Sequence, residues 1–350
     1  MKNFDYVRPG SIADAVKAAA EPGAAYLAAG TNLLDLMKGG ITRPDRLVDV
    51  TRLPGLDRIE RTADGGFRIG ALVRNADLAH DPDFAKSFPA VAEGLLSGAS
   101  AQLRNAATVG GNLLQRTRCG YFYDPHSACN KRQPGSGCDA REGENRLHAV
   151  LGWSDACIAT HPSDFCVPLV ALDAVVEIEG RSGRREVTLE ALHLLAGETP
   201  ERETVLEPGD LIVALRLSGE ARGFAAHSRY LKVRERTSYA FAVVSAAASL
   251  RIENGSIREA RLALGGVAAK PWRARAAEQV LVGAKADPAA FRRAAEAALA
   301  EAKPSGDNLF KIELARRIVV RALTLAAAGT PARIAALPAS PFASALRSAS

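Results

Sequence analysis

The stretch from Thr108 to Cys166 constrains the fold more than any other part of this sequence of 350 residues. It contains all five cysteines, is densely polar, and lacks the hydrophobic period of either a strand or a helix. A loop of this length is uncommon inside a compact domain. We therefore expect a bound group, rather than a hydrophobic core alone, to order it.

The composition predicts a globular protein of two or three domains, with 47% hydrophobic residues and a net charge of +6. The sequence contains no stretch of ~18 consecutive apolar residues, so no membrane-spanning helix is predicted. The N-terminus lacks a signal pattern, so we expect a cytoplasmic chain, or a periplasmic one exported with a signal-bearing partner. Scattered basic residues and few aromatic residues argue against a nucleic-acid partner.

Local signals predict an α+β chain. Ser11 is placed to cap a first helix, and a strand, a glycine turn, a helix and a strand then make a βαβ pattern. Hairpins are predicted at Asp64–Gly66 and at Asn254–Gly255. Helical sequence follows from Asn75 to Ser97, with breaks before Pro82 and Pro89. The predicted segments are a first lobe at 1–60, a second lobe at 61–220 with an insertion at 115–160, a C-terminal domain at 221–330 and a tail at 331–350.

Two glycine turns share a chemical character, one at Ala29–Asn32 and the other at Thr108–Asn112. Glycine allows backbone N–H groups to approach a phosphate closely, and Thr or Asn adds a side-chain hydrogen bond. Two such turns can bind both phosphates of a dinucleotide. Each turn alone is also explained as an ordinary chain reversal. Neither matches the Rossmann fingerprint or the phosphate-binding P-loop.

The cysteines are separated by gaps of nine, eight, eighteen and eight residues. An odd number of cysteines and no signal pattern argue against disulfides. Zinc sites usually contain closely spaced cysteine pairs, whereas a four-iron cluster accepts ligands from a wrapped loop, and spacing leaves both open. Cys166 lies in an apolar segment and is predicted to be a buried small hydrophobe. The predicted ligands are Cys119, Cys129, Cys138 and Cys157. The loop also carries basic residues that could offset cluster charge: Arg116, Arg118, Lys131, Arg132, Arg141 and Arg146.

The segments AAGTNLLDLM, TVGGNLLQRTRC, CNKRQPGSGCDA, ATHPSD and LGGVAAKPWRA resemble the FAD-binding medium subunits of the xanthine dehydrogenase family, to about residue 328. The cysteine loop is most similar to that of bacterial periplasmic aldehyde oxidoreductases, whose FAD subunit carries an extra [4Fe–4S] cluster. The resemblance implies a two-lobed FAD-binding domain of the vanillyl-alcohol-oxidase (PCMH) type. An α+β domain of the CO dehydrogenase flavoprotein type would follow it.

The resemblance also implies the cofactor-binding residues. The two glycine loops would bind the FAD pyrophosphate, Asp164 would bind polar groups of the flavin, and two residues come from gapless local matching (Ile212 and Lys232). The implied FAD-binding residues are Leu27, Ala28, Ala29, Gly30, Thr31, Asn32, Leu33, Leu34, Thr108, Val109, Gly110, Gly111, Asn112, Asp164, Ile212 and Lys232. The implied [4Fe–4S] ligands are the four cysteines above. No catalytic acid or base is expected here, because the flavin itself accepts the electrons.

The implied assembly is a heterotrimer in which a large subunit with a molybdenum cofactor oxidises an aldehyde. A small [2Fe–2S] subunit would pass the electrons to this FAD, and an external acceptor such as a quinone or ferredoxin would take them. The alternative within the family is the flavoprotein subunit of a 4-hydroxybenzoyl-CoA reductase-like enzyme.

Two alternatives come from other classes. One is a scaffold protein stabilised by zinc. The other is a nucleotide enzyme of the same fold, which would need acid–base residues. The loop offers few candidates for that role, namely His126, His148 and His161, and we expect His161 to be a structural hydrogen-bonding group beside Asp164.

Overall fold

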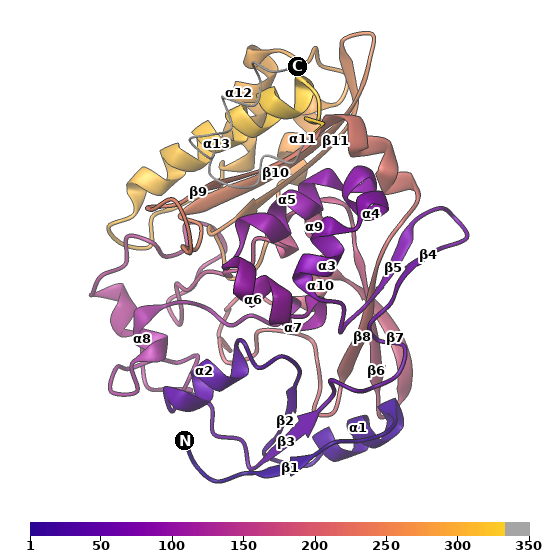
Figure 1. Ribbon diagram of the computed structural model, residues 1–350. Helices are drawn as coiled ribbons and strands as arrows, with labels where there is room; N and C mark the ends of the chain where they lie inside the picture. Colours follow the sequence, from indigo (N-terminus) through magenta and orange to yellow (C-terminus); the bar gives the residue numbers. More distant parts are fainter. Residues whose placement is uncertain (333–350) are drawn as a thin grey trace.

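The computed structural model describes residues 1–332 and contains three sheets that follow one another along the molecule (Figure 1). A three-stranded sheet lies at the N-terminal end, a five-stranded sheet in the middle, and a four-stranded sheet with the last helices at the other end. Across residues 1–332, no helix has both the length and the apolar character needed to cross a bilayer. The predicted α+β class is confirmed.

The N-terminal sheet contains the predicted parallel βαβ unit, with strands in the order β1-β3-β2. Ser11 caps the first helix, because its hydroxyl accepts the Asp14 N–H at 3.1 Å. Leu47 and Val48 of the central strand are buried, as the apolar run predicts. The elements are β1 (Asp5–Val7), α1 (Ile12–Ala19), β2 (Ala24–Leu27), α2 (Leu33–Lys38) and β3 (Arg46–Asp49).

The middle sheet is antiparallel throughout, in the order β4-β5-β8-β6-β7. Its first hairpin turns at the predicted site, where the Asp64 carboxylate accepts the Gly66 N–H at 3.1 Å. Ile69, Val176 and Leu215 place this sheet in the largest hydrophobic core of the described chain. The strands are β4 (Ile59–Arg61), β5 (Phe67–Gly70), β6 (Val175–Gly180), β7 (Gly183–Thr188) and β8 (Leu211–Leu217).

Short helices pack on this sheet, and they break where prolines predict. Asp81 ends one helix and its side chain caps the next, and Phe88 separates the following two helices just before Pro89. The helices are α3 (Asn75–His80), α4 (Pro82–Ser87), α5 (Pro89–Ser97), α6 (Ala101–Ala106), α7 (Val109–Leu113), α9 (Cys166–Ala171) and α10 (Leu189–Leu192).

The cysteine loop between α7 and α9 contains only α8 (Gly120–Tyr123), a 3-10 turn (Asp139–Arg141) and isolated bridges such as that of Cys129 with Cys138. Side-chain hydrogen bonds to backbone carbonyls connect its turns. Arg132 donates to Tyr121 O at 2.7 Å and to Phe122 O at 2.9 Å. Polar contacts therefore connect the turns of this loop, and the expectation that a bound group orders it stays a prediction.

The C-terminal sheet lies in the order β12-β11-β10-β9 and carries helices on one face (Figure 1). Along β10, Ala246 and Ala248 face the core under these helices, whereas Ala247 faces the core shared with α5 and α9. The predicted hairpin at Asn254–Gly255 is present, with φ of 51° and 75°. The elements are a 3-10 helix (Glu220–His227), β9 (Ser228–Val233), β10 (Val244–Glu253), β11 (Ser256–Gly265), β12 (Trp272–Arg273), α11 (Arg275–Leu281), α12 (Pro288–Ala298) and α13 (Leu309–Ala327).

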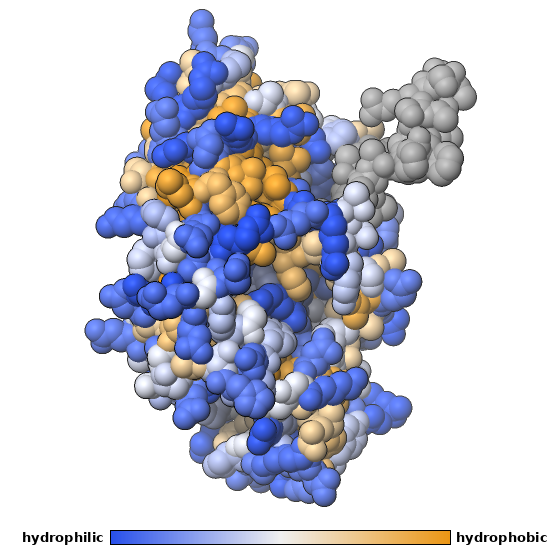
Figure 2. All heavy atoms as spheres, turned by 90° about the vertical axis from the view of Figure 1, so that its left-hand side faces the viewer, coloured by the Kyte–Doolittle hydropathy of each residue, from blue (hydrophilic) through white to orange (hydrophobic). Residues whose placement is uncertain are grey.

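Figure 2 shows the face that carries the cysteine loop: apolar side chains gather in its upper part, toward the C-terminal helices, and hydrophilic residues dominate below. The extended tail expected at 331–350 lies almost entirely outside the described residues.

Candidate functional site

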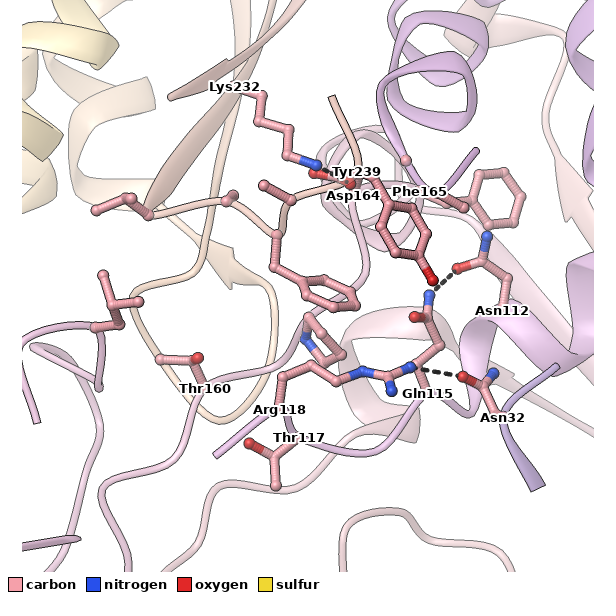
Figure 3. Close-up of a pocket in the computed structure, with 18 of the residues that line it drawn as sticks. Asn32, Asn112, Gln115, Thr117, Arg118, Thr160, Asp164, Phe165, Lys232 and Tyr239 are labelled. Carbon is pink, nitrogen blue, oxygen red and sulfur yellow. Dashed lines mark hydrogen bonds and ion pairs between the residues drawn. The ribbon is translucent and has the colours of Figure 1, made fainter. Parts of the chain in front are cut away.

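A cleft of about 720 Å³ opens where the first lobe, the second lobe and the C-terminal domain meet. A cavity of this size suits a large organic ligand. Figure 3 shows side chains from all three regions directed into it. Of the predicted FAD-binding residues, those that line it are Thr31, Asn32, Asn112, Asp164 and Lys232.

The first glycine turn presents unpaired backbone donors. Gly30 has φ +77°, and a Cβ added there would lie 2.8 Å from Leu34 Cδ1, so only glycine fits without strain. Within the described chain, the N–H groups of residues 29–32 donate to no protein acceptor. Unpaired N–H groups in a turn are ready donors to anionic oxygens.

The second glycine turn opens α7 and touches the first. Thr108 accepts the Gly111 N–H at 3.3 Å, which caps this short helix. Gly110 packs against Ala71, whose Cβ would lie 2.8 Å from an added Cβ. Asn32 Nδ2 lies 3.4 Å from Gly111 O, so the two turns meet, as the dinucleotide hypothesis requires.

Asp164 forms a buried polar cluster at the inner end of the cleft. Its carboxylate accepts hydrogen bonds from Lys232 Nζ at 2.7 Å and from Tyr230 Oη at 2.5 Å. The side chains of Asp164 and Lys232 are only 6% and 4% exposed, so this ion pair is largely shielded from water. Burial raises the pKa of Tyr230 well above its usual value, and its hydroxyl stays a proton donor to Asp164.

The cleft also contains residues that were not among the predicted FAD-binding residues. Arg118 donates to Asn32 Oδ1 at 2.7 Å and connects the cysteine loop to the first lobe (Figure 3). Tyr239 and Phe241, from the loop between β9 and β10, also line the cleft, and the Arg118 guanidinium lies 4.9 Å from the centre of the Phe241 ring. Tyr239 has φ +51°, an uncommon conformation for an aromatic residue, which draws attention to this loop only once the structure is known.

The four predicted metal ligands line one small cavity: Cys119, Cys129, Cys138 and Cys157. Cys119 also lines the cleft, so this residue is a wall shared by the two sites. Lys131 lines the cavity as well and is buried. Three turns of the loop and the segment before α9 therefore each contribute one thiol to this cavity.

Burial raises the pKa of three thiols of this cavity, that of Cys119 to about 11. The pKa values of Cys138 and Cys157 are raised for the same reason. Backbone N–H groups oppose this effect, as where Ala159 donates to Cys157 Sγ at 3.5 Å. A bound cation would offset the cost of burying thiolates, which fits a metal-binding role for these residues.

Cys166 differs from the other cysteines as predicted. It is completely buried in α9, does not line the cavity, and burial raises its pKa to about 12. His161 and His193 lie near it, with one ligand atom of each residue within 4.8 Å of the others. His161 Nδ1 already accepts the Ser163 N–H at 3.3 Å, so the lone pair of that nitrogen is occupied. His193 Nε2 lies 2.8 Å from Leu113 O, so each ring makes one hydrogen bond, and within residues 1–332 its other nitrogen has no hydrogen-bond partner.

The remaining predicted FAD-binding residues do not line the cleft. Val109 and Gly110 belong to the second turn and are buried. Ile212 lies inside β8, in the core of the middle sheet, and the structure does not bring it to the cleft.

Two family profiles match most of the chain. The "FAD binding domain in molybdopterin dehydrogenase" matches residues 2–217, and the "CO dehydrogenase flavoprotein C-terminal domain" matches residues 229–326. The chain belongs to the FAD-binding medium subunits of the xanthine dehydrogenase family. Such medium subunits are parts of molybdenum-dependent oxidoreductases, so the predicted family and enzyme class are confirmed.

Individual relatives agree with this assignment. The aldehyde oxidoreductase FAD-binding subunit PaoB of Escherichia coli (strain K12) is 50% identical, covering 94% of this medium subunit and 99% of its own length. The carbon monoxide dehydrogenase medium chain of Hydrogenophaga pseudoflava is 27% identical, covering 92% and 96%. A solved CO dehydrogenase structure from Oligotropha carboxidovorans matches with TM-score 0.74 and 26% identity, covering 94% of this chain and 99% of that one.

Proposed function

We propose that this medium subunit binds FAD in the cleft and a [4Fe–4S] cluster in the cysteine cavity. It would serve electron transfer in a heterotrimeric molybdenum-dependent aldehyde oxidoreductase, between a [2Fe–2S] small subunit and an external acceptor such as a quinone or ferredoxin. The convergence of four cysteines beside the cleft carries this proposal. The compartment would be cytoplasmic, or periplasmic by export with a partner subunit.

The cleft residues fit a dinucleotide with an extended flavin. The unpaired N–H groups of residues 29–32 would bind phosphate oxygens, and the polar side chains of Asn112 and Asp164 would orient the ring system. When bound, FAD supplies the redox chemistry, and the protein supplies binding and orientation. Asn112 is already fixed for this role, because its Oδ1 accepts from Ser163 Oγ and from Gln115 Nε2, each at 2.7 Å.

The spacing of the four sulfurs supports a cluster over a single zinc ion. Four thiolates at 2.3 Å from one zinc lie about 3.8 Å from one another by tetrahedral geometry. Within residues 1–332, the only group compact enough to hold one ion is that of His161, Cys166 and His193, and no three of the four cavity cysteines form another. A four-iron core separates the sulfurs further, because each thiolate binds a different iron.

Two further features of the cavity suit a negatively charged cluster. Lys131 places a buried cation near Cys157 and favours its thiolate form. Several backbone N–H groups also point at sulfur, including those of residues 121 and 122 at Cys119 and of residue 159 at Cys157. Hydrogen bonds to the sulfurs and nearby charge are among the features that set the potential of such clusters.

Part of the exposed surface is suited to binding partner subunits. Leu147, Leu309 and Phe310 are large exposed apolar residues, and the Arg146 guanidinium lies 5.2 Å from the centre of the Phe310 ring. Leu147 and Arg146 also line the cleft. Figure 2 shows apolar side chains gathered on this face. An exposed apolar patch beside a redox site suits a docking subunit.

Purification of the intact complex from its native cells tests this proposed function. We expect the chain to co-purify with a molybdenum-containing large subunit and a [2Fe–2S] small subunit, and we expect an aldehyde to bleach the flavin absorbance. Bleaching by a reduced ferredoxin together with a benzoyl-CoA reduction activity would favour the reductase alternative. A colourless chain that purifies alone with zinc would contradict the proposal.

Replacement of Gly30 by alanine is expected to weaken FAD binding about tenfold, which corresponds to about 1.4 kcal/mol. The new Cβ would require a left-handed residue at φ +77° and would contact Leu34, so the turn would present its N–H groups differently. Gly55→Ala is the matched control, because Gly55 also has φ +77° but no atom lies within 4 Å of an added Cβ. Titration of the apo chain with FAD, followed by fluorescence, measures both. Equal weakening in the two variants would rule out a specific role of the first turn.

A further inference from the structure

His148 lies between the cysteine cavity and the cleft. Its Nε2 is 3.2 Å from Cys119 Sγ, and both residues line the cleft. The residue is 8% exposed, so water competes little for this contact. Cys119 lines both the cysteine cavity and the cleft. His148 therefore contacts this proposed cluster ligand from the side where the flavin is proposed to bind.

The C-terminal domain holds His148 in this position. Its carbonyl oxygen accepts hydrogen bonds from Lys311 Nζ at 2.7 Å and from Asn308 Nδ2 at 3.2 Å. Both of those side chains are fully buried, and the His148 N–H donates to Asn145 O at 2.9 Å. Contacts within its own loop and with the start of α13, far away in the sequence, therefore fix the backbone position of His148.

The surroundings of the ring indicate which nitrogen carries the proton. Nδ1 of His148 is buried and has no hydrogen-bond partner within residues 1–332. A proton on Nδ1 would leave a donor buried without an acceptor, which costs more than leaving a lone pair free. The proton is therefore better placed on Nε2, where a thiolate sulfur accepts it.

We propose that His148 donates its Nε2–H to the thiolate of Cys119 and thereby raises the reduction potential of the [4Fe–4S] cluster. Donation to a ligand sulfur stabilises the more negative, reduced cluster, and such outer contacts tune metal sites. His148 is in this account a positioning residue that acts through Cys119. The inference rests on the proposed function, since it requires the cluster.

The test compares three variants of the full chain by EPR-monitored redox titration. In His148→Leu, which lacks the donor, we expect the ratio of oxidised to reduced cluster at a given potential to rise about tenfold, a downward shift of about 59 mV for one electron. His148→Gln retains an N–H donor and should shift less. His126→Leu is the control, because the His126 side chain is 94% exposed and contacts Asp124 instead of sulfur. An unchanged potential in His148→Leu would overturn the inference.

A measurement on the unaltered chain tests the same inference even where His148→Leu does not bind the cluster. ENDOR of the reduced chain with ¹⁵N-labelled histidine should show one weakly coupled histidine nitrogen. Absence of any histidine coupling would overturn the inference while leaving the proposed function intact. Absence of iron from the unaltered chain would instead contradict the proposed function.

Discussion

Replacement of Cys138 by serine is expected to remove the iron from the purified chain and to leave FAD in place. The Cys138 side chain lines the cysteine cavity and does not line the cleft. A four-iron cluster that loses one thiolate ligand is expected to fall from about four irons per chain to well below one. Colorimetric iron analysis and the flavin absorbance of the same sample measure the two cofactors independently.

Cys166→Ser is the matched control for this prediction, since it makes the same one-atom change in the helix that follows the loop. Cys166 is buried behind Ser163 and away from the cavity, so iron and FAD should both be retained. Retention of full iron by Cys138→Ser, or its loss from Cys166→Ser alone, would contradict the ligand assignment.

Replacement of Asp164 by alanine is expected to destabilise the fold by about 3–5 kcal/mol, because it leaves a buried charge without its partner. Lys232 would keep only its 3.1 Å contact with Ser97 O, and Tyr230 would lose its carboxylate acceptor. The free energy of unfolding is measured by urea denaturation of the apo chain, followed by far-UV circular dichroism. FAD occupancy should fall as well if Asp164 orients the flavin.

Two further variants distinguish the stability lost with the ion pair from the general effect of removing an aspartate. In Asp164→Ala/Lys232→Met the unpaired charge is gone, so the loss should be smaller than the sum of the two single losses. Asp45→Ala breaks an exposed pair with Lys2, whose side chains are 67% and 43% exposed, and should cost under about 1 kcal/mol. A loss in Asp164→Ala no larger than that in Asp45→Ala would show that the buried pair contributes little.

Local signals predicted most of the elements in this chain. The helix cap at Ser11, the hairpins at Asp64–Gly66 and Asn254–Gly255, and the helix breaks before Pro82 and Pro89 depend on a few neighbouring residues. Such signals do not require knowledge of the tertiary fold. The division of the cysteines also followed from local context, because an apolar helix buries Cys166 whereas polar turns present the others.

The parts of the site that the sequence did not predict depend on contacts between distant segments. Arg118 meets Asn32 from 86 residues away, and Lys311 holds the carbonyl of His148 from 163 residues away. Tyr239 reaches the cleft from a loop of the C-terminal domain. For Ile212, local matching suggested a contact with the cofactor, but the middle sheet buries this residue.

In the proposed function, one chain would hold a flavin and an iron–sulfur cluster side by side. Metal and flavin analysis of the unaltered chain after anaerobic purification, with EPR after dithionite reduction, tests it most directly. We expect about four irons and about one FAD per chain, little zinc, and an EPR signal of a reduced four-iron cluster. About one zinc per chain, without iron and without such a signal, would contradict the claim.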